Sequence, residues 1–253
     1  MNVPLLNNVF FARLADMVSR SSRDGCAVFS PFLDERECAE AQQWCLHNAG
    51  GLRYMLWGGF PEARRRMLAV YPDYCEGYIK EEYPFVCLTL SFRREDRLTH
   101  RDILGTFMGM QLKRNVIGDI VTGEGAAQVF VTDVAGKAIM SGVRKIGRVG
   151  VKISDSEPFE MEVVQEFRAV GGTVASMRLD CIVSLAAGVS REKASCLIRG
   201  EKVSVNHLEV TAPASELESG DVISIRGCGR FLLSDIGDTT KKGRIHVTLQ
   251  KYI

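Results

Sequence analysis

The order of predicted elements between residues 84 and 154 constrains the fold more than any other feature of the sequence. The strand FVCLTLSF precedes the helix THRDILGTFMGMQL, which Thr99 is placed to cap. The strands GDIVTG and AAQVFVT flank a hairpin turn, and the helix DVAGKAIMSGVRKI and strand VGVKI follow. This β-α-β-β-α-β order predicts a ferredoxin-like unit, as in RNA-recognition domains. The aromatic motif with which those domains stack bases is missing.

Residues 1–82 predict a small N-terminal α/β domain. The first 22 residues indicate an amphipathic helix rather than a signal peptide, and a short strand, CAVFSPFL, follows. The helix DERECAEAQQWCLHNA is closed by Gly50-Gly51. LRYMLWGGF predicts a strand. PEARRRMLAVY predicts a helix that begins near Pro61 and carries the triplet Arg64-Arg65-Arg66.

Composition and cysteine spacing limit the class of protein. The chain has 253 residues, enough for more than one core, and 46% of them are hydrophobic. No run of about 20 apolar residues is present, so we expect no membrane span. The eight cysteines include no C-x-x-C pair, which argues against zinc and favours reduced thiols in a cytoplasmic protein. We expect no metal and no cofactor.

Charge is segregated along the chain, although the net charge is only +1. Residues 136–154 carry five basic residues and no acidic one, and residues 155–166 carry five acidic residues and no basic one. From residue 226 to 253, six basic residues accompany two acidic ones. Basic faces of this kind are typical of proteins that bind polyanions, although a single charged run is more often solvated surface. The acidic run and RAVGGTVAS, residues 168–176, predict a linker.

The stretch MRLDCIVSLAAGVSREKASCLIRGEKVSVN, residues 177–206, predicts two short helices and a strand. Gly188 is placed to end the first helix and Ser190 to cap the second. Arg191 and Arg199 share a face of the second helix, where we expect both to reach solvent and suit phosphate oxygens. Apolar residues recur at helical spacing in both helices: Leu179, Ile182, Val183 and Ala186, then Ala194, Leu197 and Ile198.

This stretch resembles the S-four RNA-binding domain, named after a small-subunit ribosomal protein. The family pattern of R-L-D, S-R-x-x-A, G-x-V-x-V-N and G-D-x-I is matched from Arg178 to Ile223. Upstream, VFSPFLDERE, GGFPEARRRM and LTHRDILGTFMGMQLKRNVIGDI resemble the bacterial YlmH family, whose members carry two N-terminal domains before an S-four domain. The resemblance implies three domains in an α+β protein: residues 1–82, a ferredoxin-like domain at 83–168, and an S-four-type domain at 175–253.

The family resemblance also implies a function. It indicates binding to ribosomal RNA, the large ribosomal subunit and tRNA during rescue of stalled translation, with support of C-terminal tailing of the nascent chain. A role in cell division has also been proposed for the family. We expect a cytoplasmic monomer with neither enzymatic activity nor a small-molecule substrate. The residues expected to contact RNA are Arg178, Ser190, Arg191, Lys193, Arg199, Lys202, Asn206, Arg226, Lys241 and Lys242.

Three alternative functions remain open at the level of sequence. R-L-D also occurs in pseudouridine synthases, where the aspartate is the nucleophile, but a synthase needs a large catalytic domain around it. Some methyltransferases carry S-four domains, yet TGEGAAQ lies between two predicted strands with no helix to receive a cofactor. The third alternative is a module whose basic faces bind acidic protein surfaces. Nuclease treatment would leave that interaction intact.

Overall fold

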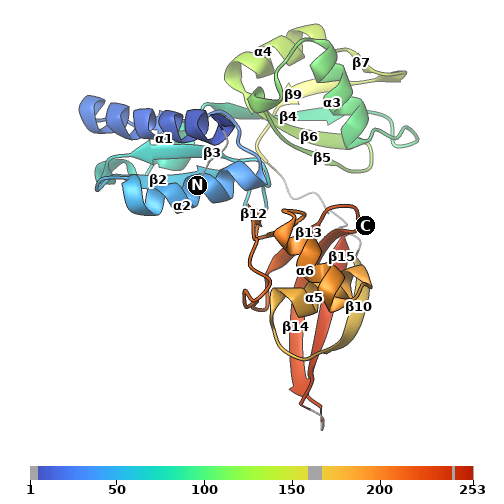
Figure 1. Ribbon diagram of the computed structural model, residues 1–253. Helices are drawn as coiled ribbons and strands as arrows, with labels where there is room; N and C mark the ends of the chain where they lie inside the picture. The colour runs from blue at the N-terminus through green and yellow to red at the C-terminus, as the bar shows by residue number, and fades with distance from the viewer. Residues whose placement is uncertain (1–4, 159–166, 241–242, 253) are drawn as a thin grey trace. The chain divides into compact units, whose positions relative to one another are not determined.

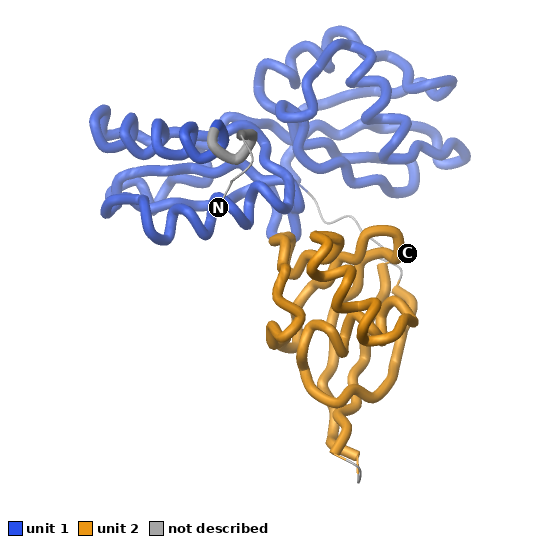
Figure 2. Tube along the Cα trace, in the orientation of Figure 1, with its two compact units in different colours: residues 1–163 blue, residues 164–253 orange. Residues whose placement is uncertain are grey.

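A computed structural model describes residues 5–158, 167–240 and 243–252, and it divides into two compact units. Unit 1 comprises residues 1–163 and unit 2 comprises residues 164–253 (Figure 1, Figure 2). Both units combine helices with antiparallel sheets. None of the helices in the described part is both long and apolar enough to cross a membrane.

The N-terminal part of unit 1 is a three-stranded sheet with two helices on one face (Figure 1). Leu68 and Val70 face these helices, while Met67, Ala69 and Tyr71 pack into a second cluster on the other face. The antiparallel order is β1-β3-β2. The elements are α1 (Leu5–Asp24), β1 (Val28–Phe29), α2 (Glu35–Asn48), β2 (Arg53–Trp57) and β3 (Met67–Tyr71).

The helix predicted from Pro61 is wrong. Residues 61–66 are irregular, and residues 67–71 form β3, which pairs on both sides and is buried throughout. Ala, Arg, Glu, Met and Leu favour helix, but their propensity differences are well below 1 kcal/mol per residue. Burial of both faces of a central strand outweighs that preference.

The second sheet of unit 1 has the order β5-β6-β4-β9, with all neighbours antiparallel. Its elements follow the expected β-α-β-β-α-β order, and Thr99 caps α3 in a reciprocal capping box with Asp102. The elements are β4 (Phe85–Ser91), α3 (His100–Gly109), β5 (Ile117–Thr122), β6 (Ala126–Thr132), α4 (Asp133–Gly142) and β9 (Lys152–Asp155).

The second helix of this segment ends earlier than predicted. Helix α4 ends at Gly142, and the residues expected to continue it form a small hairpin of β7 (Lys145–Ile146) and β8 (Val149–Gly150). Gly147 turns this hairpin with φ of +57°, a conformation that glycine adopts at no steric cost. The hairpin extends away from the four-stranded sheet (Figure 1), and Lys145 and Arg148 lie in it.

The two sheets of unit 1 share a core and a polar clamp. Phe32 and Phe130 are each 1% exposed and belong to the same cluster as Met67 of β3. Next to them, the guanidinium of Arg65 donates to the carbonyl oxygens of Phe32, Arg114 and Ile117 at 3.0–3.3 Å. One arginine thereby joins the segment before β3 to the start of β5.

Unit 2 is a six-stranded antiparallel sheet, β10-β15-β14-β13-β11-β12, with α5 and α6 against one face (Figure 1). The second part of the predicted linker, at 168–176, is wrong, because β10 pairs with β15 along its whole length. Most of its acidic part, residues 159–166, lies outside the described residues. The elements are β10 (Phe167–Val174), α5 (Leu179–Ala187), α6 (Arg191–Arg199), β11 (Val203–Val205), β12 (Leu208–Glu209), β13 (Val222–Ile225), β14 (Gly229–Thr239) and β15 (Ile245–Tyr252).

Candidate nucleic-acid interface

The turn between α5 and α6 forms as the sequence predicts. Gly188 ends α5 with φ of +63°, and its N–H donates to the carbonyl oxygens of Leu185 and Ser184. The hydroxyl of Ser190 caps α6 by accepting the Lys193 N–H at 3.2 Å. The hydroxyl of Ser184 donates to the Val189 carbonyl and closes the turn. These local bonds fix the orientation of the residues on both sides.

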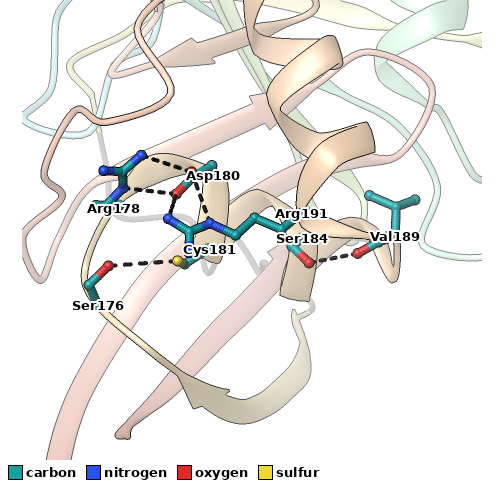
Figure 3. A network of polar contacts seen from close by, with 7 residues as sticks. All are labelled: Ser176, Arg178, Asp180, Cys181, Ser184, Val189 and Arg191. Atoms are coloured by element: carbon teal, nitrogen blue, oxygen red, sulfur yellow. Dashed lines mark hydrogen bonds and ion pairs between the residues drawn. The ribbon is translucent and has the colours of Figure 1, made fainter.

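Two arginines donate hydrogen bonds to one buried aspartate, Asp180, in the first turn of α5 (Figure 3). Arg178, just before α5, donates from Nε and Nη2 to the Asp180 carboxylate at 3.2 and 3.0 Å. Arg191, at the start of α6, donates from Nε and Nη2 to the same carboxylate at 3.0 and 3.3 Å. We call these three residues the double-arginine site. It combines two positive charges with one negative charge.

The aspartate is buried but the arginines are not. The Asp180 side chain is 5% exposed, whereas those of Arg178 and Arg191 are 39% and 51% exposed. Burial raises the pKa of Asp180, but hydrogen bonds from Arg178 and Arg191 outweigh it and lower this pKa to about 2. The carboxylate is therefore ionised at neutral pH and holds both guanidinium groups in place.

The geometry leaves donors for a further anion. Each guanidinium carries five N–H donors. Each makes its two bonds to Asp180 through Nε and Nη2, so the Nη1 donors are not used by this carboxylate. A phosphate could accept these donors without breaking the bonds to Asp180. Because the arginines are already oriented, binding would cost less side-chain entropy than binding to free arginines.

The sequence placed Arg191 beside Arg199, but its partner in the structure is Arg178. Arg199 lies at the opposite end of α6 and is exposed. Lys202 and Arg226 are neighbours there, because the Arg226 N–H donates to the Lys202 carbonyl at 2.9 Å, and both are exposed. The predicted basic residues thus form two groups, one at each end of α6, with Lys193 exposed on its first turn.

Two other predicted contact residues serve the fold. Ser190 is the cap of α6. The Asn206 side chain donates to the Asp221 carboxylate at 2.7 Å and accepts the Val222 N–H at 3.0 Å, which fixes the β11–β12 turn beside β13. Both side chains are therefore already engaged in hydrogen bonds within the protein. The predicted phosphate contacts Lys241 and Lys242 lie outside the described residues.

Sequence reasoning missed two members of the site region. Asp180 was not among the residues expected to form the site, and its second partner, Arg191, lies 11 residues away in sequence. Arg244 was counted in the basic C-terminal region but not as a site residue. It donates from Nε to the Thr173 hydroxyl at 3.0 Å and from Nη2 to the Thr173 carbonyl. Its place depends on the pairing of β10 with β15, which was not predicted.

Unit 1 presents a second basic surface, which we call the basic segment. Its five members lie on α4, on the β7–β8 hairpin and at the start of β9, and all are exposed. None forms an ion pair with a described residue. The members are Lys137, Arg144, Lys145, Arg148 and Lys152.

No cluster suited to a metal ion occurs within the described ranges, where no three His, Cys, Asp or Glu side chains come together. All eight cysteines are free thiols, and five of them are buried. Burial raises the pKa of the Cys38, Cys45 and Cys87 thiols to about 11, so these three are protonated at neutral pH. They pack as small apolar side chains.

Comparison with known proteins covers most of the chain. Family models described as "YlmH, N-terminal" and "Putative RNA-binding domain in YlmH" match residues 7–75 and 80–160. The second range contains the basic segment. Ribosome-associated protein quality control protein P2 of Bacillus subtilis (strain 168) is 30% identical over 198 residues, which are 77% of this chain and 76% of that protein.

A solved structure shows a related fold. The Cell division protein ylmH from Streptococcus pneumoniae is 20% identical, with a TM-score of 0.51, and the match covers 63% of this chain and 95% of that chain. At this identity the likeness concerns the fold alone. The two family models and the extent of identity with the B. subtilis protein agree, and the chain is a member of the YlmH family.

Proposed function

We propose that this protein binds ribosomal RNA and tRNA on the large ribosomal subunit during quality control of stalled translation. In this role it supports C-terminal tailing of the nascent chain, acts in the cytoplasm and works as a monomer. The double-arginine site of unit 2 and the basic segment of unit 1 both contact RNA. The observation that carries the proposal is the buried carboxylate of Asp180, which orients two half-exposed guanidinium groups.

Two comparisons support this proposal from outside the site. The B. subtilis relative is named for ribosome-associated quality control, and the family model over residues 80–160 is described as RNA-binding. We assign the middle sheet to the ferredoxin-like class, because its order β5-β6-β4-β9 follows from a β-α-β-β-α-β chain. We assign residues 175–253 to the S-four type, on the motif residues Arg178, Asp180 and Arg191.

The protein acts without catalysis in this proposal. A catalytic aspartate must reach its substrate, but Asp180 is 3% exposed and its oxygens accept hydrogen bonds from two arginines. A carboxylate with a pKa of about 2 is also a weak nucleophile and a weak base. The glycine-containing TGEGAAQ is a turn between β5 and β6, where no helix N-terminus follows Gly125.

Binding of the full chain to purified large ribosomal subunits tests the proposal. Arg178→Gln combined with Arg191→Gln removes two charges from the double-arginine site, and we expect affinity to fall by roughly 10–100-fold. Arg36→Gln combined with Arg53→Gln removes the same charge from exposed surface ion pairs of unit 1 and is the matched control. The control should bind within about twofold of the unmodified protein.

The result has clear alternatives. If the double variant melts normally and binds subunits as the control does, the double-arginine site does not contact RNA. If nuclease treatment leaves the association intact, the partner is a protein, and the third alternative from the sequence is favoured. Crosslinking followed by RNA sequencing identifies the RNA strand that each unit contacts.

A further inference from the structure

A groove lies beside the double-arginine site in unit 2. It runs between the end of β10 and the α5–α6 turn and holds about 530 Å³, within the range of ~300–1,000 Å³ typical of small-ligand pockets. Thr173, Val174 and Ala175 line it from β10 and the residue after it. Leu185 and Val189 line it from the turn, and Figure 3 shows Cys181, Ser184, Val189 and Arg191 from the same region.

The polar groups of this groove are arranged for an anion. Arg191 and Arg244 both contribute to its lining, and the described lining residues include no acidic side chain. Arg191 is held by Asp180, and Arg244 is held by the hydroxyl and carbonyl of Thr173. Arg191 begins α6 and Arg244 directly precedes β15, and each has a partner that fixes its guanidinium beside the groove.

We infer that this groove takes a single unpaired nucleotide of an RNA strand. The apolar floor of Val174, Leu185 and Val189 receives the base, and Arg191 and Arg244 bind its phosphates. The inference rests on the proposed RNA-binding function and adds to it a preference for RNA with an unpaired residue.

A nucleotide fits this groove better than other anionic ligands, for two reasons. A planar guanidinium can stack on a base as well as bind a phosphate, so Arg191 and Arg244 suit both parts of a nucleotide. The hydroxyls of Thr173 and Ser184 are engaged with Arg244 and Val189, so the floor offers contact area rather than hydrogen bonds. Such a floor accepts any base, as is usual where stacking dominates recognition.

A pair of RNA duplexes tests this inference with the full chain. One is a blunt duplex, and the other is the same duplex with one bulged nucleotide. We expect the unmodified protein to bind the bulged duplex about tenfold more tightly, which is the effect of one stacked base. Ala175→Trp should fill the groove and remove this preference, while affinity for the blunt duplex stays the same. Ala175 is exposed, so the larger side chain need not disturb the core.

The matched control is Ala169→Trp. Ala169 is an exposed residue of β10, the strand that Ala175 directly follows, but it does not line the groove, so its variant should keep the tenfold preference. Arg244→Gln is the second variant, and it should reduce the preference to about threefold or less. If melting shows that Ala175→Trp does not fold, the Arg244→Gln result alone tests whether the groove binds the unpaired nucleotide.

The outcomes separate this inference from the proposed function. Equal binding of both duplexes by the unmodified protein overturns the inference and leaves RNA binding standing. A folded Ala175→Trp protein that keeps the preference, or an Arg244→Gln protein with the full tenfold ratio, overturns it as well. Failure to bind either duplex contradicts the proposed function itself.

Discussion

Arginine and aspartate form a network in each unit. In one network an arginine guanidinium points into the protein, and in the other the guanidinium groups point into solvent. In unit 1, Arg65 directs its guanidinium inward to three backbone carbonyls, and Asp119 accepts the N–H groups of Arg64 and Arg65. In unit 2, Asp180 is the buried partner, and the guanidinium groups of Arg178 and Arg191 extend into solvent.

The pKa shifts of the two aspartates differ in sign because their hydrogen-bond donors differ. Burial raises the pKa of Asp119, although hydrogen bonds from the Arg64 and Arg65 backbone oppose it. At Asp180, hydrogen bonds from two arginine side chains outweigh burial and lower the pKa. In unit 1 burial also lowers the pKa of Arg114 to about 10, with the charge of Arg65 adding to this effect. The carbonyl partners make the first network a clamp, and the exposed donors of the second are the basis of the binding surface proposed above.

The largest expected effect is on the clamp. Arg65→Ala leaves the carbonyl oxygens of Phe32, Arg114 and Ile117 without this donor, and we expect unit 1 to lose roughly 3 kcal/mol or more of stability. Thermal or urea unfolding measures the loss. Arg64→Ala is the neighbouring control and should cost at most about 1 kcal/mol, because its side chain is 52% exposed and its backbone bond remains. Equal losses in both variants would contradict the clamp.

The second effect concerns acid stability of unit 2. The folded pKa of Asp180, about 2, lies below the usual 3.8, so its contribution is complete above about pH 5 and is lost as pH falls towards 2. This contribution amounts to about 2 kcal/mol. Urea unfolding between pH 6 and 2 should show this loss in the unmodified protein and a smaller one in Asp180→Asn. An identical pH profile for both proteins would mean that Asp180 is not held by the arginines.

The third effect separates binding from stability. Arg191→Ala should lower RNA affinity by about tenfold or more while costing only about 0.5–1 kcal/mol of stability, because Arg178 still neutralises Asp180. Arg168→Ala, also an exposed arginine of unit 2, should change neither quantity appreciably. Filter binding and melting curves measure both. An Arg191→Ala protein that is less stable but binds RNA with unchanged affinity would mean that this network only stabilises the fold, as the clamp does.

The smallest effect is expected in the basic segment. Arg148 is exposed at the turn between β7 and β8, so Arg148→Ala should leave stability within about 0.5 kcal/mol. If it contacts a phosphate, the slope of log affinity against log salt should fall by about one. A titration over several salt concentrations gives the slope. An unchanged slope would restrict the RNA contacts to other residues.

Local signals predicted much of unit 2's helical region. Ser190 and Gly188 mark helix ends by capping chemistry that depends only on neighbours in sequence. Leu197 illustrates the limit, because its spacing predicts core, yet it is only half-buried while Ile198 is fully buried. Periodicity gives the face of a helix, but the width of the buried stripe depends on what packs against it.

Tertiary pairing decided the features that the sequence did not predict. The residues of β3 favour helix locally, and their position between two strands overrides that preference. RAVGGTVAS contains two glycines and resembles a linker, but β15 pairs with it from a distance of more than 70 residues. The partnership of Arg191 with Asp180 likewise depends on the packing of α6 against α5.

The pairing of β10 with β15 has a consequence for synthesis. Val174 pairs with Ile245, 71 positions later, so β10 has no partner until the final strand of the unit has been made. At ~5–20 residues per second this interval lasts roughly 4–14 s. During it, one long strand edge stays available for wrong pairing. We therefore expect β10 to be the last strand of unit 2 to join its sheet.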